Sequence, residues 1–203
     1  MFNIFTKKNI ETDKSILKYW DNVFETEIER GSTRIAIDRF DTTIELIEDG
    51  SSILDIGCGR GEFIEYLLTK KSNCSVIGVD FSTVAITEAK HRVDNVNFIV
   101  GDISTGKGFE NITKVDVVTS FEVIEHLTDP MSMIKQVEKH LKQHGYFVLT
   151  LPFENMVDGG DEHINSFGFS DVMSLFSKQW DILTMSRYYR NFSNLFVLAR
   201  FNG

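Results

Sequence analysis

An apolar run that ends in an acid and leads into three alternating glycines constrains this chain most. Residues 53–63 read ILDIGCGRGEF, with Gly57, Gly59 and Gly61 at every second position. Glycine lets the backbone turn sharply, so a ligand can lie against the main chain. Amides at the start of the helix expected from Glu62 would face that ligand with partial positive charge. The segment therefore predicts a strand, a nucleotide-binding loop and a helix.

The residue after the last glycine bears on which nucleotide fits. A dinucleotide fold has the pattern G-x-G-x-x-G/A, and its last small residue allows the helix to pack closely on the strand. Here the sixth position is Glu62. Its carboxylate would repel a pyrophosphate at the helix start. NAD and FAD are therefore disfavoured, whereas an adenosyl ligand with a positive sulfonium and no phosphate meets no such objection.

The pattern D-x-G-x-G-x-G over residues 55–61 resembles motif I of the class I S-adenosylmethionine-dependent methyltransferases. The resemblance implies a Rossmann-like α/β fold: a mostly parallel seven-stranded sheet with a C-terminal antiparallel hairpin and helices on both faces. It also implies S-adenosyl-L-methionine as the methyl donor and S-adenosyl-L-homocysteine as the product. The likeness covers residues 50–200.

The rest of the chain alternates between expected strands and helices, which is typical of a parallel sheet covered by helices. We expect strands near 52–56, 75–80, 96–100, 115–120 and 145–151, and helices near 13–29, 33–48, 61–70, 82–92 and 130–143. Asp129 and Pro130 mark the start of the last of these helices, and Gly145 its end. A helix near 170–178 and strands near 180–188 and 194–201, joined by a turn at 190–191, complete the chain. This predicts one domain over 1–203, with a helical N-terminal cap at 1–48 and a core at 50–201.

The composition limits the classes of partner that this chain is expected to bind. The 203 residues carry a net charge of −9 with a pI near 5.0, whereas a nucleic-acid groove needs a basic surface. No apolar stretch reaches membrane-spanning length, and the N-terminus lacks the order of a signal peptide. Cys58 and Cys74 fall at opposite strand ends, so we expect free thiols and a cytoplasmic protein. The expected partner is a small-molecule acceptor, with no membrane and no nucleic acid; a homodimer stays open.

Polar residues follow successive strands, at the edge where open α/β sheets bind ligands. Asp80 ends the second strand and suits hydrogen bonding to ribose hydroxyls; the alternative is a cap for the next helix, a role that Ser82 can fill. By resemblance, Asp102 and the amide of Ile103 hold the adenine edge, although Asp102 is also suited to a turn before Gly106. The predicted cofactor-binding residues are Asp55, Gly57, Gly59, Gly61, Asp80, Phe81, Asp102, Ile103 and Phe121; the two phenylalanines contact adenine or the sulfonium, or are core aromatics.

Glu122, Glu125 and His126 lie in the stretch EVIEHL, and His163 lies in DEHINSF. Spacings of three and four place the first three on one face of a helical turn, and with His163 they would suffice for a divalent metal. A similar set occurs in small-RNA 3′-terminal 2′-O-methyltransferases, which use a metal. The same string occurs in metal-free small-molecule methyltransferases, including the ubiquinone-pathway and sugar N- or O-methyltransferases, and DEHINSF resembles that branch more closely. We therefore expect no metal.

Methyl transfer from a sulfonium is a displacement on a reactive donor, so catalysis is mostly positioning. A base is needed only where the acceptor begins protonated, and neutral imidazole is suited to that near pH 7. We expect His126 and His163 to act on the acceptor, and Glu122 to hold an amine. The acceptor pocket is expected from 13–48 and 152–170. The rival from another class is a protein that binds S-adenosylmethionine without reacting.

Overall fold

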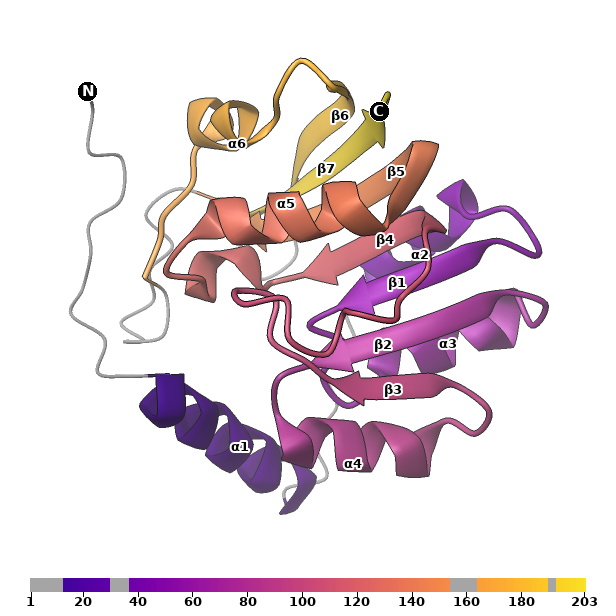
Figure 1. Ribbon diagram of the computed structural model, residues 1–203, viewed down its shortest axis with the longest axis vertical. Helices are drawn as coiled ribbons and strands as arrows, with labels where there is room; N and C mark the ends of the chain where they lie inside the picture. The colour runs from indigo at the N-terminus through magenta and orange to yellow at the C-terminus, as the bar shows by residue number, and fades with distance from the viewer. Residues whose placement is uncertain (1–12, 30–36, 154–163, 190–192) are drawn as a thin grey trace. The chain divides into compact units, whose positions relative to one another are not determined.

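The computed structural model describes residues 13–29, 37–153, 164–189 and 193–203 (Figure 1). Contacts divide the chain into two compact units. We call the first, which holds residues 13–102 and 106–111, the N-terminal unit. The second, which holds residues 103–105 and 112–203, is the C-terminal unit. That the two fold together as one domain stays a prediction.

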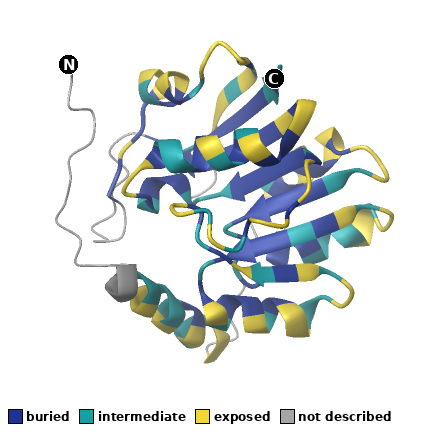
Figure 2. Cartoon of the chain, viewed as in Figure 1, coloured by how far each residue is buried: buried dark blue, intermediate teal, exposed yellow. Residues whose placement is uncertain are grey.

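The N-terminal unit carries helices and strands in alternation after two initial helices. Its elements are α1 (Asp13–Glu29), α2 (Ile37–Leu46), β1 (Ser52–Ile56), α3 (Glu62–Lys70), β2 (Ser75–Asp80), α4 (Thr83–Arg92) and β3 (Asn97–Val100). β1 and β3 both pair with β2 in parallel. β1 is buried along four consecutive residues instead of alternating, because both faces of a parallel sheet are covered. The dark blue of β1 and β2 in Figure 2 shows this burial.

Gly78 of β2 marks the tightest packing in this unit. A Cβ atom at Gly78 would lie 2.7 Å from Cδ1 of Phe98 and 2.9 Å from Cδ1 of Ile64. Phe98 is its register partner on β3, and Ile64 comes from α3. The missing side chain lets a helix and a neighbouring ring approach the strand closely.

The C-terminal unit contains β4 (Val115–Phe121), the short 3₁₀ turn η1 (Ile124–His126), α5 (Pro130–His140), β5 (Leu141–Pro152), α6 (Phe169–Leu175), β6 (Trp180–Tyr189) and β7 (Ser193–Phe201). β4 and β5 are parallel, and β7 is antiparallel to both β5 and β6. α5 begins as predicted, since Oδ1 of Asp129 accepts a hydrogen bond from the Met131 amide at 3.1 Å and Pro130 opens the helix.

The strand order is β3-β2-β1-β4-β5-β7-β6. Parallel pairs make up most of it, and the antiparallel hairpin is C-terminal. This confirms the predicted fold class. The bounds of the first two strands and of the first helix are also as predicted.

The predicted boundary between the helix near 130–143 and the strand near 145–151 is wrong. α5 ends at His140 and β5 begins at Leu141, so Gly145 lies inside the strand. Leu141 is fully buried and pairs with Val115, which draws the chain into the sheet directly after the helix. A Cβ atom at Gly145 would lie 2.8 Å from the Asp116 carbonyl oxygen. The glycine therefore serves strand packing, not helix termination.

Further outcomes concern local structure. Cys58 and Cys74 are free thiols, as predicted. His140 at the end of α5 is buried, and its Nδ1 lies 3.1 Å from the Ile112 carbonyl oxygen. The second helix spans Ile37–Leu46, inside the predicted 33–48. The expected turn at 190–191 falls outside the described residues. No helix in the described part of the chain is long and apolar enough to cross a bilayer.

Candidate cofactor and acceptor site

The glycine loop between β1 and α3 has the conformation that its sequence predicts. Gly57, Gly59 and Gly61 have φ values of 71°, 53° and 79°. An L-residue with a side chain rarely adopts such backbone angles. Three left-handed residues in five turn the chain from the strand into the helix that starts at Glu62.

The amides of this loop are turned inward. Those of Gly57 and Cys58 donate to the Val79 carbonyl oxygen at 2.7 and 3.0 Å, and that of Gly61 donates to the Cys58 carbonyl oxygen at 3.0 Å. The Gly59 amide donates to Oδ2 of Asp80 at 2.9 Å. A pyrophosphate loop needs such amides aimed at the ligand. With four of them engaged within the chain, the loop is unsuited to phosphate.

Asp80 holds together the two segments on either side of it. Its Oδ2 accepts from Gly59, and its Oδ1 accepts from the Ser82 amide at 2.9 Å. Ser82 caps α4, because its Oγ accepts from the Ala85 amide at 3.1 Å. Capping is thus the role of Ser82, which leaves Asp80 as the acid at the strand end. Each carboxylate oxygen has a second lone pair, so ribose contact by Asp80 stays a prediction compatible with these bonds.

Buried acids set the electrostatics of the loop. Asp80 is 6% exposed, and burial raises its pKa to about 6, against which three backbone hydrogen bonds act. Asp55 is buried beside the loop. Burial also raises the pKa of the Cys58 thiol, to which Asp80 and Asp55 contribute. The thiol is therefore protonated near pH 7, and the carboxylates favour a cationic ligand such as a sulfonium.

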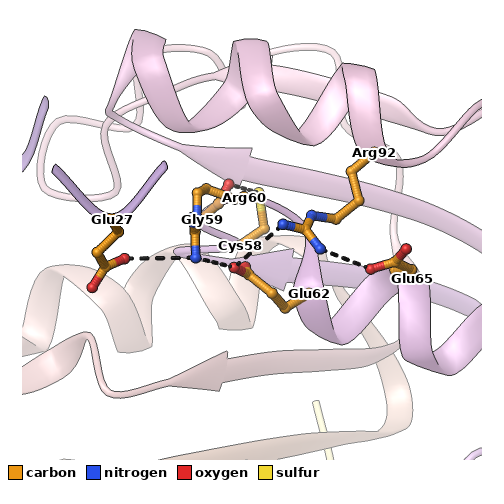
Figure 3. Close-up of polar contacts among 7 residues, drawn as sticks. All are labelled: Glu27, Cys58, Gly59, Arg60, Glu62, Glu65 and Arg92. Atoms are coloured by element: carbon orange, nitrogen blue, oxygen red, sulfur yellow. Dashed lines mark hydrogen bonds and ion pairs between the residues drawn. The ribbon is translucent and has the colours of Figure 1, made fainter. Parts of the chain in front are cut away.

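Glu62 does not stand alone as the sequence suggested. Its Oε1 lies 2.8 Å from Nη2 of Arg60 and 3.9 Å from Nη2 of Arg92. Figure 3 shows these residues in a line of alternating charges. Arg60, only 2% exposed, also lies 3.7 Å from Oε2 of Glu27 on α1. Arg92 in turn pairs with Glu65 at 3.0 Å. The charge of Glu62 is therefore compensated, and the inward amides disfavour pyrophosphate more strongly than its carboxylate does.

The segment after β3 forms a turn before Gly106, which was the alternative role predicted for Asp102. The Asp102 amide donates to the Lys107 carbonyl oxygen at 2.8 Å, and its own carbonyl accepts from the Gly106 amide at 2.8 Å. These bonds involve the backbone only, so adenine contact by the Asp102 side chain and the Ile103 amide stays a prediction. Ile103 is buried within the C-terminal unit, and Phe81 is half-buried directly after β2.

In the C-terminal unit the end of β4 is strained. Glu122 has φ 57°, which is uncommon for a residue with a side chain. Its amide donates to the Thr150 carbonyl oxygen at 3.0 Å, and Oγ1 of Thr150 donates to its Oε1 at 2.7 Å. The prediction that Glu122 shares a helical face with His126 is therefore wrong, since only Ile124–His126 form a helical turn. Phe121 packs against the buried cluster of Val148, Phe196 and Leu198, so it has the contacts of a core aromatic.

Glu125 and His126 lie together in η1. Glu125 is 1% exposed, and its Oε1 lies 3.6 Å from Nε2 of His126. Its backbone carbonyl accepts from the amides of Ile164 and Asn165, both at 3.1 Å, while Nδ2 of Asn165 donates to the Leu127 carbonyl oxygen at 2.7 Å. These bonds fix the end of the segment after β5 against η1.

The structure thus brings the predicted residues together in two groups. Asp55, the three glycines and Asp80 meet in the N-terminal unit, and Glu122, Glu125 and His126 lie along the end of β4 in the C-terminal unit. His163 lies outside the described residues. Among the residues that are described, no group of three or more His, Cys, Asp or Glu could hold a metal ion.

Sequence comparison places this site in a family. A family model described as a methyltransferase domain matches residues 47–184. The chain belongs to this methyltransferase family. The predicted membership of the class I S-adenosylmethionine-dependent superfamily is thereby confirmed. Residues 47–184 include the glycine loop, Asp80 and the end of β4.

The chain is also similar to individual methyltransferases. The chain is 31% identical over 110 residues to N-methyltransferase 4 of Papaver somniferum, covering 52% of this chain and 31% of that protein. It is 33% identical over 108 residues to the ubiquinone biosynthesis O-methyltransferase of Haemophilus ducreyi, covering 50% and 45%. The chain therefore spans less than half the length of these relatives. Magnesium protoporphyrin IX methyltransferase of Synechocystis, solved with bound SAM, has the same fold, with a TM-score of 0.72 at 16% identity over 96% of this chain and 99% of that one.

Proposed function

We propose that this protein transfers the methyl group of S-adenosyl-L-methionine to an oxygen or nitrogen atom of a small-molecule acceptor. The observation that carries the proposal is the glycine loop, whose amides are engaged within the chain while buried acids surround it. Such a loop suits an adenosyl ligand that is cationic and has no phosphate. Relatives named for N- and O-methyl transfer support both kinds of acceptor atom.

The loop residues fit the donor as follows. Gly57, Gly59 and Gly61 keep the backbone open to it, and Asp80 accepts hydrogen bonds from the ribose hydroxyls. Asp102 and the Ile103 amide would hold the adenine edge with Phe81 beside it, and Phe121, which is only partly buried against its core cluster, would flank the sulfonium. The bound donor supplies an activated methyl group on sulfur. The chain's own contribution is orientation, because a displacement of this kind requires the two reacting atoms to be aligned.

The end of β4 handles the acceptor. His126 accepts the proton of an acceptor hydroxyl or ammonium, because neutral imidazole is available near pH 7. Glu122 holds an amine acceptor by its carboxylate. The relatives named above favour neither the RNA-modifying alternative nor a protein that binds the donor without reacting.

Binding and turnover test the proposal separately. Calorimetry should show binding of S-adenosylhomocysteine and no binding of NAD; the reverse result would refute the reading of the loop. Methyl-labelled S-adenosylmethionine is then incubated with 3,4-dihydroxybenzoate as a catechol probe and tryptamine as an amine probe, with and without EDTA. His126→Ala should lower the labelled product by about 10²-fold or more without changing S-adenosylhomocysteine affinity. Unchanged turnover would exclude His126 as the base.

A further inference from the structure

Acidic side chains of helix α1 contact two segments of the predicted donor site, the residue that caps α4 and the glycine loop. Asp21 accepts a hydrogen bond from Oγ of Ser82, the residue whose amide donates to Asp80. Six residues later, Glu27 lies 3.7 Å from the buried guanidinium of Arg60, the residue between Gly59 and Gly61. Between the two, Phe24 is buried, with its ring 3.6 Å from where a Cβ atom of Gly59 would lie. All three contacts fall on the segments that form the predicted donor site.

We propose that Asp21 and Glu27 are positioning residues of the donor site, with Asp21 acting on Asp80 through Ser82 and Glu27 acting on the glycine loop through Arg60. The proposal rests on the proposed function, because it assumes that Asp80 and the glycine loop bind the methyl donor. It gives α1 a role in donor binding, whereas the sequence had assigned residues 13–48 to the acceptor pocket.

The two acids are expected to act differently. Ser82 links Asp21 to Asp80 by two hydrogen bonds, so the negative charge of Asp21 opposes ionisation of Asp80 and raises its pKa. The other titratable groups nearby are Cys58, which stays protonated near pH 7, and the acids Asp55 and Glu62, which act on the Cys58 thiol. Glu62 is compensated by Arg60. Asp21 is therefore an acid on another element that acts on Asp80, and its removal should change the ionisation of Asp80.

Glu27 has no such effect on Asp80, since its contact is with Arg60. Its carboxylate draws the guanidinium toward α1, while Glu62 holds the same group from the helix side at 2.8 Å. Figure 3 shows Arg60 between these two acids. Without one of these two acids, the charge of the buried arginine is only partly compensated, which disturbs the backbone of the glycine loop.

Calorimetric titration of the full chain with S-adenosylhomocysteine between pH 5 and pH 7 separates the two roles. The α-amino and α-carboxyl groups of this ligand titrate outside that range. Asp21→Asn keeps an oxygen to accept from Ser82 but removes the charge. We expect the midpoint of binding against pH to move downward, so that affinity at pH 5 becomes roughly threefold tighter than in the wild type while that at pH 7 is little changed. Glu27→Gln should weaken binding several-fold at every pH.

Asp94→Asn, which neutralises an exposed acid in the same unit, is the control and should change neither quantity. Asp21→Ala serves as the second variant if Asp21→Asn does not fold. An unchanged midpoint for both Asp21 variants, or an equal loss at every pH, would overturn the role of Asp21, because a purely structural contact gives only the latter. Unchanged affinity in Glu27→Gln would overturn the role of Glu27. If the wild type fails to bind at any pH, the proposed function fails first, which is a different result from either.

Discussion

Replacing Asp80 by asparagine should separate the stability of this protein from its function. Burial raises the Asp80 pKa to about 6, above the ordinary aspartate value of 3.8. The folded state therefore binds more protons than the unfolded state between pH 4 and pH 6. Stability from this group is fully present below the unfolded pKa and is lost as the pH rises through the folded pKa.

The magnitude follows from that difference. At 1.36 kcal/mol per pKa unit, the whole titration corresponds to about 3 kcal/mol, of which the wild type should lose about 2 kcal/mol between pH 4 and pH 7, because an unfolded aspartate is already partly ionised at pH 4. Asp80→Asn cannot ionise, so the difference in unfolding free energy between variant and wild type should change by about this amount in favour of the variant. Any constant loss from the bonds to Gly59 and Ser82 cancels in that change, as does the titration of groups that do not interact with Asp80.

Urea unfolding at half-unit steps from pH 4 to pH 8 measures this difference. Asp181→Asn is the matched control. Asp181 is an exposed acid, and its hydrogen bond from Arg200 lowers the pKa of its carboxyl. The same Asp80→Asn protein should bind S-adenosylhomocysteine about tenfold to a hundredfold more weakly at pH 7, since a charged acceptor is lost. A flat difference across this pH range would refute the burial reasoning, and unchanged affinity would exclude Asp80 from the donor site.

Three other substitutions test separate features. Glu122→Gly should be about 1 kcal/mol more stable than Glu122→Ala in thermal unfolding, the reverse of the usual order, because φ is 57° at this position; the opposite order would show that no strain is held there. The wild type should lose stability as the pH falls below the unfolded histidine pKa of about 6.5, because burial lowers the pKa of His140. His140→Asn should remove this loss, since asparagine can keep the bond to the Ile112 carbonyl. Parallel curves of unfolding free energy against pH for variant and wild type would contradict this. Gly78→Ala should lose about 1–3 kcal/mol of unfolding free energy, because its Cβ would meet Phe98 at 2.7 Å, and the added change Phe98→Leu should restore part of it; an undiminished stability in the single variant would contradict the close packing.

Local signals in the sequence were sufficient where one segment determines its own structure. The spacing of Gly57, Gly59 and Gly61 predicted the turn, in which all three have φ above 50°. Runs of apolar residues were sufficient to predict the bounds of β1 and β2. The end of α5 was missed because Leu141 is drawn into the sheet by Val115, 26 positions earlier. The same applies to Arg60 and to the strained Glu122, whose partners Glu27 and Thr150 come from other elements. No spacing rule predicts such pairs, because they depend on how helices and strands pack.

The hydrogen bonds that shape the glycine loop also decide which ligands it can take. Val79 and Asp80 lie at the end of β2, and between them they accept the amides of Gly57, Cys58 and Gly59. An amide held by a carbonyl or carboxylate oxygen of the chain is no longer available to a phosphate, so the bonds that stabilise the loop also reject pyrophosphate. In a phosphate-binding loop the same glycines leave their amides open, and the ligand completes the structure. The choice between the two ligand classes is therefore made by the strand that follows α3, and the glycine spacing alone does not determine it.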